Sequence, residues 1–220
     1  ILSEMNHALE NGEFQVYLQP KVNMQTGKII GSEALVRWQH PGKGLISPAA
    51  FVPVFEKNGF IIEIDKYMIR NTCAIIRRWI DSGIPVYPVS VNLSRLNLYN
   101  KRIIQDISEY VEEYQIPREY ISFEITESAF SGDNSYIKIL AEKLQIPVDV
   151  LKIDLKFLPA GENDEKANLI IKHVVEMAVD LDLMIIVEGV EREEQVEFLT
   201  KIGCKIAQGF YYYRPISVLE

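Results

Sequence analysis

Glutamate and arginine lie inside an apolar segment near the start of this 220-residue sequence. The stretch EALVR carries Glu33 and Arg37 among residues that favour a buried strand, where a charge is rarely left unless it is paired or binds a ligand. Because side chains alternate along a strand, Glu33, Leu35 and Arg37 should share one face. An acid and a base on the same face indicate a binding site rather than a packing surface.

Polar residues of the same kind stand at or near the ends of the other apolar segments. They are Gln19, Asn92, Glu124, Lys152, Asp154, Glu188 and Gln208. A single glutamate in such a place is usually a solvated loop residue or a helix cap, but the repetition favours a shared site. Carboxylates gathered at one place would repel one another without a cation, and oxygen ligands suit a hard divalent ion such as Mg²⁺ or Mn²⁺.

This mixture of acids and bases predicts metal-assisted hydrolysis of a phosphate ester. One bound metal can lower the pKa of a water and hold a phosphate oxygen, and two metals about 4 Å apart can clamp both the attacking and the leaving oxygen. Lys152 could position or deprotonate the water, because a desolvated lysine beside a cation has a lowered pKa. Arg37 suits a phosphate contact, since its guanidinium is forked and permanently charged.

The aromatic run FYYYRP at 210–215 follows Gln208 directly. Half or more of such runs only pack a core or its rim, but here a ring could also stack on a nucleotide base.

Other chemistries find little support. The sequence contains no GxSxG nucleophile motif and no glycine-rich phosphate loop of the GxGxxG or GxxxxGK[ST] type. His7, His40 and His173 are expected on a helix, a turn and a helix, away from the strand ends. Cys73 and Cys204 lie far apart without zinc-site spacing, so we expect two buried, reduced thiols, as is typical of a cytoplasmic protein.

The composition is that of an ordinary soluble domain, with 48% hydrophobic and 25% charged residues and a mean hydropathy of +0.01. The net charge of −8 disfavours a groove for long nucleic acid, which would carry a basic excess. No apolar run approaches the ~18 residues that span a membrane, so no membrane contact is expected from this domain. A chain that starts at Ile1 is expected to have been cut from a longer protein.

Strand-like and helix-like segments alternate along the whole chain, which predicts one domain with a mainly parallel sheet. The link NMQTG between the first two strands predicts a hairpin, so the first strand should run antiparallel to the second. Without a glycine-rich phosphate loop, a (β/α) barrel is favoured over an open doubly wound sheet, although a barrel needs eight strands and about 250 residues. We expect strands at 14–20, 29–37, 86–93, 120–127, 148–154, 183–189 and 205–211, and helices at 2–12, 47–59, 64–82, 101–115, 134–145, 164–182 and 191–202.

A set of short motifs along almost the entire chain resembles the EAL domain family, the cyclic di-GMP phosphodiesterases of bacterial signalling. Each motif alone is modest, but the order and the spacing are specific. The matching segments are YLQP at 17–20, EALVRW at 33–38, SPAAFVPVFEKNG at 47–59, SVNLS at 90–94, FEITES at 123–128, VDVLKID at 148–154, VEGVE at 187–191 and QGFYYYRP at 208–215.

The resemblance implies a TIM-type (β/α)8 barrel with one antiparallel strand, and Mg²⁺- or Mn²⁺-dependent hydrolysis of cyclic di-GMP to linear pGpG. By motif position, the metal ligands would be Glu33, Asn92, Glu124 and Glu188, and two ions are expected. Lys152 resembles the general base, helped by Gln208 and by Glu188, with Asp154 as a possible additional member. Substrate contacts would come from Gln19, Leu35, Arg37, Asn92, Phe210, Arg214 and Pro215, and Glu127 would anchor a loop over the site.

The resemblance also implies partners. Members of this family often form homodimers and carry sensor or GGDEF-type domains in the same polypeptide, so residues 1–220 would be a single EAL-type barrel domain taken from a multidomain cytoplasmic signalling protein.

The sequence departs from the family pattern at one place. Between Gln145 and Ile146–Pro147, the family has a further strand with a DDFG-type motif, whose adjacent aspartates contribute to the metal site. This missing piece matches the missing eighth strand. A genuine deletion would open the barrel, so we favour a segment that the protein has and this sequence lacks.

Three functions remain open at this point. An active phosphodiesterase is favoured by the intact EAL, ExxE, Lys152 and Glu188. The absent aspartate pair favours a module that binds cyclic di-GMP without cutting it. An unrelated metal-dependent barrel enzyme or a scaffold protein is the third alternative.

Overall fold

The computed structural model describes residues 1–98, 100, 102–125, 150–155, 165–180 and 184–218, in two compact units. The first unit comprises Ile1–Leu18, Glu33–Ile146 and Ile216–Glu220, and the second comprises Gln19–Ser32 and Pro147–Pro215. The chain passes from one unit to the other within its first two strands. The expectation of a single domain stays a prediction.

The first unit combines parallel and antiparallel strands with several helices. Strands β5 (Ile121–Ile125), β4 (Val89–Leu93), β2 (Ile29–His40) and β1 (Phe14–Asn23) follow one another in the sheet, and β4 and β5 pair in parallel. Short strands β3 (Gly44–Ile46) and β9 (Ile216–Ser217) pair with β2 and β1. The helical elements are α1 (Met5–Glu10), α2 (Pro48–Asn58), α3 (Ile61–Asp81), α4 (Arg95–Leu98), α5 (Ile103–Glu113) and η1 (Arg118–Tyr120).

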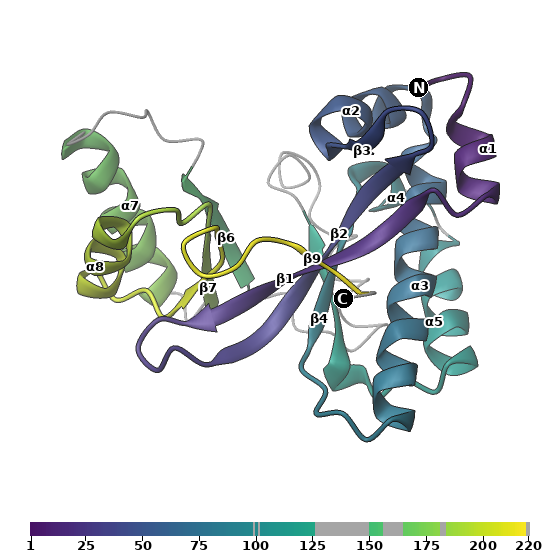
Figure 1. Cartoon of the computed structure of the whole chain (residues 1–220). Coiled ribbons are helices and arrows are strands. Elements are labelled where there is room, and N and C mark those ends of the chain that lie inside the picture. Colours follow the sequence, from purple (N-terminus) through teal and green to yellow (C-terminus); the bar gives the residue numbers. More distant parts are fainter. Residues whose placement is uncertain (99, 101, 126–149, 156–164, 181–183, 219–220) are drawn as a thin grey trace. The chain divides into compact units, whose positions relative to one another are not determined.

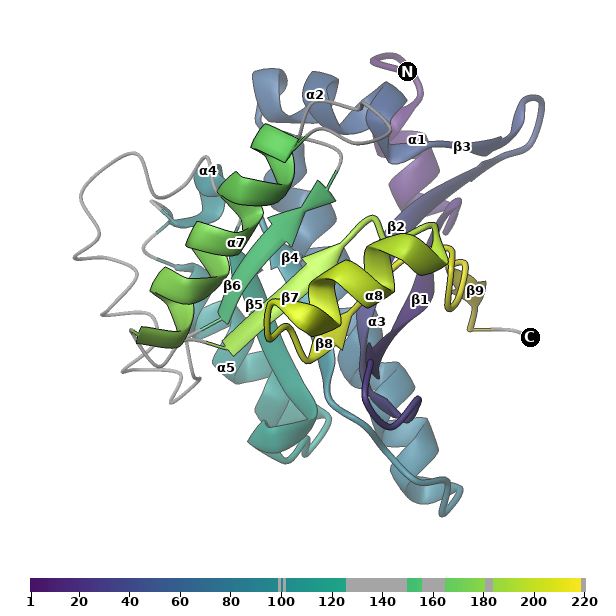
Figure 2. The same ribbon diagram turned by 90° about the vertical axis from the view of Figure 1, so that its left-hand side faces the viewer.

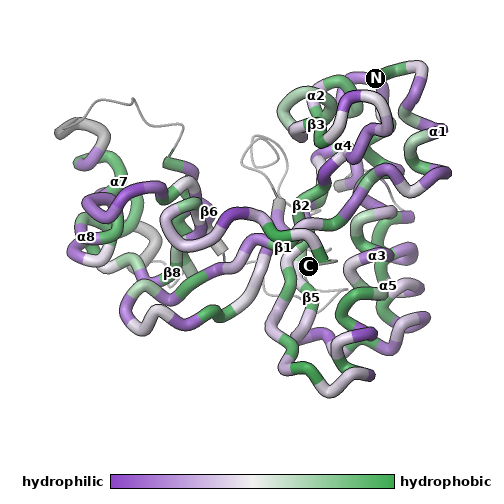
Figure 3. Tube along the Cα trace, viewed as in Figure 1, coloured by the Kyte–Doolittle hydropathy of each residue, from purple (hydrophilic) through white to green (hydrophobic). Residues whose placement is uncertain are grey.

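The longest of these helices, α3, lies beside α5 and β4 (Figure 1). Its apolar residues recur three or four positions apart, which places them on one face of a helix, and Figure 3 shows the resulting alternation of hydrophobic and hydrophilic segments. The buried apolar set includes Ile61, Ile64, Met68, Ile69, Cys73, Ile75 and Ile76. Because this helix packs against β4, α3 supports the strand that carries Asn92.

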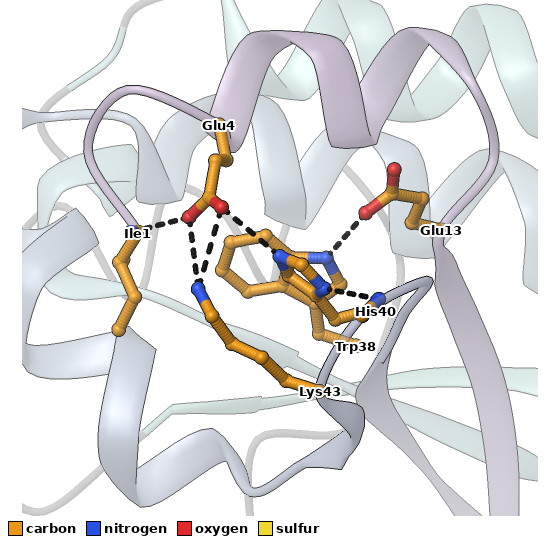
Figure 4. A network of polar contacts seen from close by, with 7 residues as sticks. Ile1, Glu4, Glu13, Trp38, His40 and Lys43 are labelled. Atoms are coloured by element: carbon orange, nitrogen blue, oxygen red, sulfur yellow. Dashed lines mark hydrogen bonds and ion pairs between the residues drawn. The ribbon is translucent and has the colours of Figure 1, made fainter.

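An aromatic cluster fixes the outer face of β2. Trp38 is fully buried, with ring centroids 5.1 Å from Phe14 and 5.8 Å from Phe51. Its indole Nε1 donates to Glu13 Oε2 at 2.8 Å, while the neighbouring Glu4 and His40 form their own contact at 3.1 Å (Figure 4). Since side chains alternate, the Trp38 side of β2 anchors the strand and leaves the opposite side to Glu33 and Arg37.

The second unit has its own parallel strands. Strands β6 (Val150–Asp154), β7 (Met184–Glu188) and β8 (Ile206–Ala207) pair in parallel, and β1 runs antiparallel to β8. Helix α7 (Glu165–Asp180) packs on β7, and α8 (Glu193–Lys201) follows β7 in the chain (Figure 2). A core that includes Val175, Val187, Leu199 and Ala207 holds helices and strands together.

The predicted arrangement of elements is largely confirmed. All seven expected strands are present, although the last is only two residues long, and six of the seven expected helices lie within two to three residues of the observed bounds. The expected helix at 134–145 lies outside the described residues. Sequence reasoning missed β3, β9, α4 and η1, each of four residues or fewer, because such short elements have no measurable periodicity. No described helix is both long and apolar enough to cross a membrane.

Candidate active site

Three sequence-predicted site residues meet on neighbouring strands of the first unit. The register of β4 and β5 places Asn92 directly beside Glu124, and β2, which carries Glu33, is the other neighbour of β4. Glu33 and Glu124 are buried, at 4% and 7% exposure. Each offers a carboxylate oxygen within 4.8 Å of the other. Two acids held so close in a poorly hydrated place are the arrangement that a cation stabilises.

The amide of Asn92 is oriented by one of these acids. Its Nδ2 donates a hydrogen bond of 2.6 Å to Glu33 Oε1. This bond uses the amide nitrogen and not the oxygen, which is the atom that a hard cation prefers. Glu33, Asn92 and Glu124 are three of the four residues that were expected to hold a metal, and they lie together in the first unit.

Arg37 follows Leu35 by two residues on β2, so the two side chains share one face of the strand. Both side chains are half-buried. The Arg37 Nη1 donates to the Val36 carbonyl at 2.9 Å, and its guanidinium lies 5.8 Å from the centre of the Tyr17 ring. Burial lowers the pKa of Arg37, but a guanidinium remains charged at neutral pH. Arg37 can therefore offer a fixed positive charge on the strand that carries Glu33.

In the second unit, Lys152 and Glu188 form an ion pair. Lys152 lies on β6 and Glu188 ends β7, where it stands beside Asp154 in the parallel register. The side chains of Lys152 and Glu188 are mostly buried, at 19% and 23% exposure. Three of the residues predicted from strand ends thus gather at one edge of the β6–β7 pair.

Gln208 and Gln19 meet in the second unit although 189 positions separate them. Gln208 Nε2 donates to Gln19 Oε1 at 3.0 Å, and Gln19 Nε2 donates to the Tyr213 carbonyl at 3.0 Å. Both side chains are buried, at 3% and 7% exposure. Gln19 therefore ties the side chain of Gln208 to the backbone of the aromatic loop that follows it.

The backbone after β8 is locked onto the backbone after β7. The Gln208 N–H donates to the Val187 carbonyl at 2.8 Å, and the Val190 N–H donates to the Gln208 carbonyl at 3.2 Å. Directly after Gln208, Gly209 lies so close to Val190 that a Cβ at position 209 would collide with the Val190 backbone. This contact sets the position of Gln208 relative to Glu188, and no role for Gly209 was expected from the sequence.

Two of the predicted substrate contacts are exposed in the aromatic loop, residues 210–215. Phe210 is 45% exposed, and the Arg214 guanidinium lies 4.5 Å from the centre of its ring. Arg214 is also exposed, while Pro215 is half-buried. An exposed aromatic ring can stack on a flat base, and an arginine beside it can bind a phosphate.

Four further residues considered in the sequence have different outcomes. Glu127 lies outside the described residues, so its role as loop anchor stays a prediction. His40, expected in a turn, is the last residue of β2, where it contacts Glu4. The two cysteines are free and buried, as expected, and burial raises the pKa of the Cys73 thiol to about 12 and that of Cys204 to about 11.

Sequence reasoning missed one buried acid near the site. Asp65 on α3 is 6% exposed, and its Oδ2 accepts bonds of 2.8 Å from both the Ser94 N–H and Asn97 Nδ2. Burial raises the pKa of Asp65 to about 6. The sequence signal was an acid on the apolar face of an amphipathic helix, next to Ile64 and Met68.

The fold and these groups define an α/β protein with acidic strand ends, and comparison with known proteins identifies the family. The EAL domain model matches residues 2–145 and 139–215. The chain belongs to the EAL domain family.

Two curated relatives come from Pseudomonas aeruginosa. The bifunctional diguanylate cyclase/cyclic di-GMP phosphodiesterase MucR is 31% identical over 239 residues, which cover 98% of this chain and 35% of MucR. The cyclic di-GMP phosphodiesterase RocR is 28% identical over 98% of this chain and 60% of RocR. The chain therefore spans less than two thirds of either relative.

A solved structure of the PaMucR phosphodiesterase in complex with c-di-GMP is 32% identical, with a TM-score of 0.86 over 98% of this chain and 97% of that one. The solved EAL domains are TIM-like barrels, and the described strands agree with the predicted class, since β4–β5 and β6–β7–β8 are parallel and β1 opposes β8. The fold class is confirmed.

The comparisons also bear on the internal departure from the family pattern. The family model is matched in two segments that meet at 139–145, beside the point where the sequence lacks the DDFG-type strand. The MucR alignment is 239 residues long, which exceeds the 220 residues of this chain, so MucR has residues without a counterpart here. Both findings agree with an internal segment of the family being absent from this sequence.

Proposed function

We propose that this chain hydrolyses one phosphodiester bond of cyclic di-GMP, with Mg²⁺ or Mn²⁺, to give linear pGpG. The observation that carries the proposal is the group formed by Glu33, Asn92 and Glu124, in a chain that belongs to the EAL domain family. Relatives with high coverage of the chain are named cyclic di-GMP phosphodiesterases.

The residues of the first unit fit a divalent metal. They offer two carboxylates and one amide, which are oxygen donors of the kind that Mg²⁺ and Mn²⁺ take. Their carboxylate oxygens lie within 4.8 Å of each other, close enough for both to bind one divalent ion. When bound, the metal would supply charge neutralisation at the phosphate and a more acidic water. Glu188 is proposed as a further metal ligand, and we propose that two ions bind.

The proposed reaction balances with the residues at hand. The water oxygen forms a bond to phosphorus, the ester bond from phosphorus to the leaving sugar oxygen breaks, and one proton moves from the water to that oxygen. Lys152 is the proposed base for the water proton, and Gln208 would orient the water. The ion pair with Glu188 fixes the Lys152 nitrogen as an ammonium, which must first release its own proton to solvent before the neutral amine can take the proton of the water. The hydrogen bond between Gln208 and Gln19 fixes the amide of Gln208.

Substrate contacts are assigned by chemistry. Arg37 and Arg214 would meet phosphates, and Phe210 would stack on a guanine. Leu35 and Pro215 would supply apolar contact, and Asn92 and Gln19 would add hydrogen bonds. Glu127 is proposed to anchor a loop over the bound nucleotide, and Asp154 to support Lys152.

A second function, recognition of cyclic di-GMP without cleavage, is favoured by one observation. The family model matches in two segments, at the place where the aspartate pair of the family is absent. A chain without these acids could keep the arginines and the aromatic ring that bind nucleotide and lose part of the metal site.

One experiment separates the two functions. Purified chain is titrated with cyclic di-GMP in a calorimeter, first with a chelator and then with Mn²⁺, and the cell contents are analysed for pGpG by chromatography. The enzyme proposal expects pGpG only with metal. Binding with no pGpG in either condition supports the receptor, and absence of binding contradicts both.

The context of the domain is proposed on the same basis. MucR is named as both a cyclase and a phosphodiesterase, and this chain matches only 35% of its length. The remaining length of MucR leaves room for other domains, which supports a polypeptide with GGDEF-type or sensor domains here. A cytoplasmic location and a homodimer are further proposals. Size-exclusion chromatography with light scattering checks the dimer, which would have twice the 25.3 kDa mass of the chain.

A further inference from the structure

We propose that Asp65 is a positioning residue for the metal site: it holds the loop after β4 and thereby sets the direction of the Asn92 side chain. The inference rests on the proposed function, because it concerns the same metal. Asp65 belongs to α3 and touches none of the proposed metal ligands. It acts on the site through the backbone that follows Asn92.

The first step is the attachment of the strand end. Asp65 Oδ2 accepts the Ser94 N–H at 2.8 Å, and Ser94 is only two residues beyond Asn92. The residue between them, Leu93, is fully buried. The strand end is thus held by a buried side chain and by a hydrogen bond to a buried carboxylate, and both restrict rotation of the Asn92 backbone.

Asp65 also holds the far end of the loop, through Asn97. Asn97 is fully buried and donates from Nδ2 to the same Asp65 oxygen at 2.8 Å and to the Ile62 carbonyl at 3.4 Å. The Asn97 N–H also donates to the Ser94 carbonyl at 3.0 Å, which closes the turn. Asp65 therefore joins both ends of the segment 94–97 to the first turns of α3.

The third step is the connection to the metal ligands. Asn92 donates to Glu33 at 2.6 Å and stands beside Glu124 in the strand register. A small turn of the β4 end would move the amide away from both acids. Outer partners of this kind commonly change metal affinity 10- to 100-fold when they are removed.

Stability alone does not account for this acid. Burial raises the pKa of Asp65 to about 6, so keeping the carboxylate ionised at neutral pH is unfavourable for the folded state. An acceptor that costs stability while it fixes the strand end of Asn92 is what a positioning role predicts.

The test measures Mn²⁺ binding by calorimetry, without nucleotide, and the melting temperature of the same samples. Asp65→Ala should weaken Mn²⁺ binding about 10- to 100-fold. Asp65→Asn keeps one oxygen as acceptor and should restore binding to within a few-fold of the wild-type value. If Asp65→Ala does not fold, Asn97→Ala removes the loop attachment from the other side and should give the same loss.

The matched control is Asp106, a second acid on the same helix layer. It is 5% exposed and pairs with Lys66 of α3 at 2.8 Å and with Arg102 at 3.1 Å, neither of which belongs to the 94–97 loop. Asp106→Asn should lower the melting temperature without weakening Mn²⁺ binding by more than about twofold, well below the effect of a lost outer partner.

The outcomes separate the two proposals. If folded Asp65→Ala binds Mn²⁺ as tightly as the wild type, or if Asp106→Asn weakens binding equally, the positioning role is overturned while the proposed function stands. If the wild-type chain binds no Mn²⁺, the metal-dependent function fails and the inference fails with it.

Discussion

At the residue scale, Lys152 is the group whose chemistry can be separated from its packing. It is mostly buried and ion-paired with Glu188, so removing the side chain would leave a carboxylate without its cation. Arginine can keep the pair, but it cannot take up a proton near neutral pH because its guanidinium is always charged.

We therefore expect Lys152→Arg to fold with a melting temperature close to that of the wild type and to lose turnover at least about 100-fold, the usual contribution of a general base. The measurements are circular dichroism on heating and the rate of pGpG formation. Turnover within a few-fold of the wild type would contradict the role of Lys152 as base.

Asp65 gives a prediction about pH. Its pKa is about 6 in the folded chain against 3.8 for a free aspartate, so the folded state binds this proton more tightly than the unfolded state. The associated stability is present in full below about pH 4 and is lost as the pH rises through about 6, with a total near 3 kcal/mol. The raised pKa is due first to burial and also to the nearby Glu56.

Asp65→Asn removes this titration. The free energy of unfolding of the variant minus that of the wild type should therefore increase between pH 4 and pH 7, because only the wild type loses stability over this range. Urea unfolding at four pH values measures the difference, and parallel curves for the two proteins would count against the raised pKa.

The proximity of several candidate residues could be predicted from the sequence. Glu33, Asn92 and Glu124 were expected together because strand ends in a parallel sheet lie at one edge, and polar residues in apolar strands are easy to see; their role as a site stays a prediction. Asp65 was missed because one acid on a helix looks like any solvated residue until the loop that it binds is located. The bond from Gln208 to Gln19 could not be predicted from pattern, since it depends on the antiparallel pairing of β1 with β8.

At the element scale, the connection between the ends of β7 and β8 depends on Gly209. Any Cβ at this position would collide with the Val190 backbone, and backbone atoms have little freedom to move aside. The two backbone hydrogen bonds of Gln208, to Val187 and from Val190, position it next to the strand that carries Glu188.

Gly209→Ala should therefore lower both the melting temperature and the turnover, with a loss of stability of about 1–3 kcal/mol as for other overpacked sites. Gly42→Ala is the matched control, because its Cβ would lie at an ordinary 3.8 Å from the His40 ring, and its φ is not positive. Equal stability of Gly209→Ala and Gly42→Ala would contradict the proposed close contact.

Elements with strong periodicity or clear end signals were predicted best. Helix α2 begins with Ser47 and Pro48 and ends at Gly59, which has a left-handed φ of 81°, and all three signals are visible in the sequence. Strand β8 was predicted too long because the apolar run 205–211 continues into a loop, where the bonds from 208–213 to Val190 and Gly209 replace the sheet pairing.

At the scale of the whole molecule, metal should act as a stabilising ligand. Mn²⁺ at 100 times its dissociation constant would stabilise the folded chain by about 2.7 kcal/mol. For a chain of this size, that corresponds to a rise in melting temperature of roughly 5–10 °C. The rise should disappear with a chelator and in Glu33→Ala, and equal rises in the wild type and in Glu33→Ala would place the metal elsewhere.

The family and the α/β class were accessible from the order of motifs and from the alternation of strands and helices. The internal departure was also visible, because the eighth strand and the aspartate pair were missing at the same place.

The most direct test of the account is the rate at which this chain converts cyclic di-GMP to pGpG with Mg²⁺ or Mn²⁺, compared with Glu33→Ala and with the exposed-site control Glu112→Ala. The account predicts pGpG formation by the wild type and by Glu112→Ala, and a loss of at least about 100-fold in Glu33→Ala, consistent with removal of a metal ligand. A wild-type chain that binds cyclic di-GMP and forms no pGpG, or a Glu33→Ala variant with near-normal turnover, would contradict it.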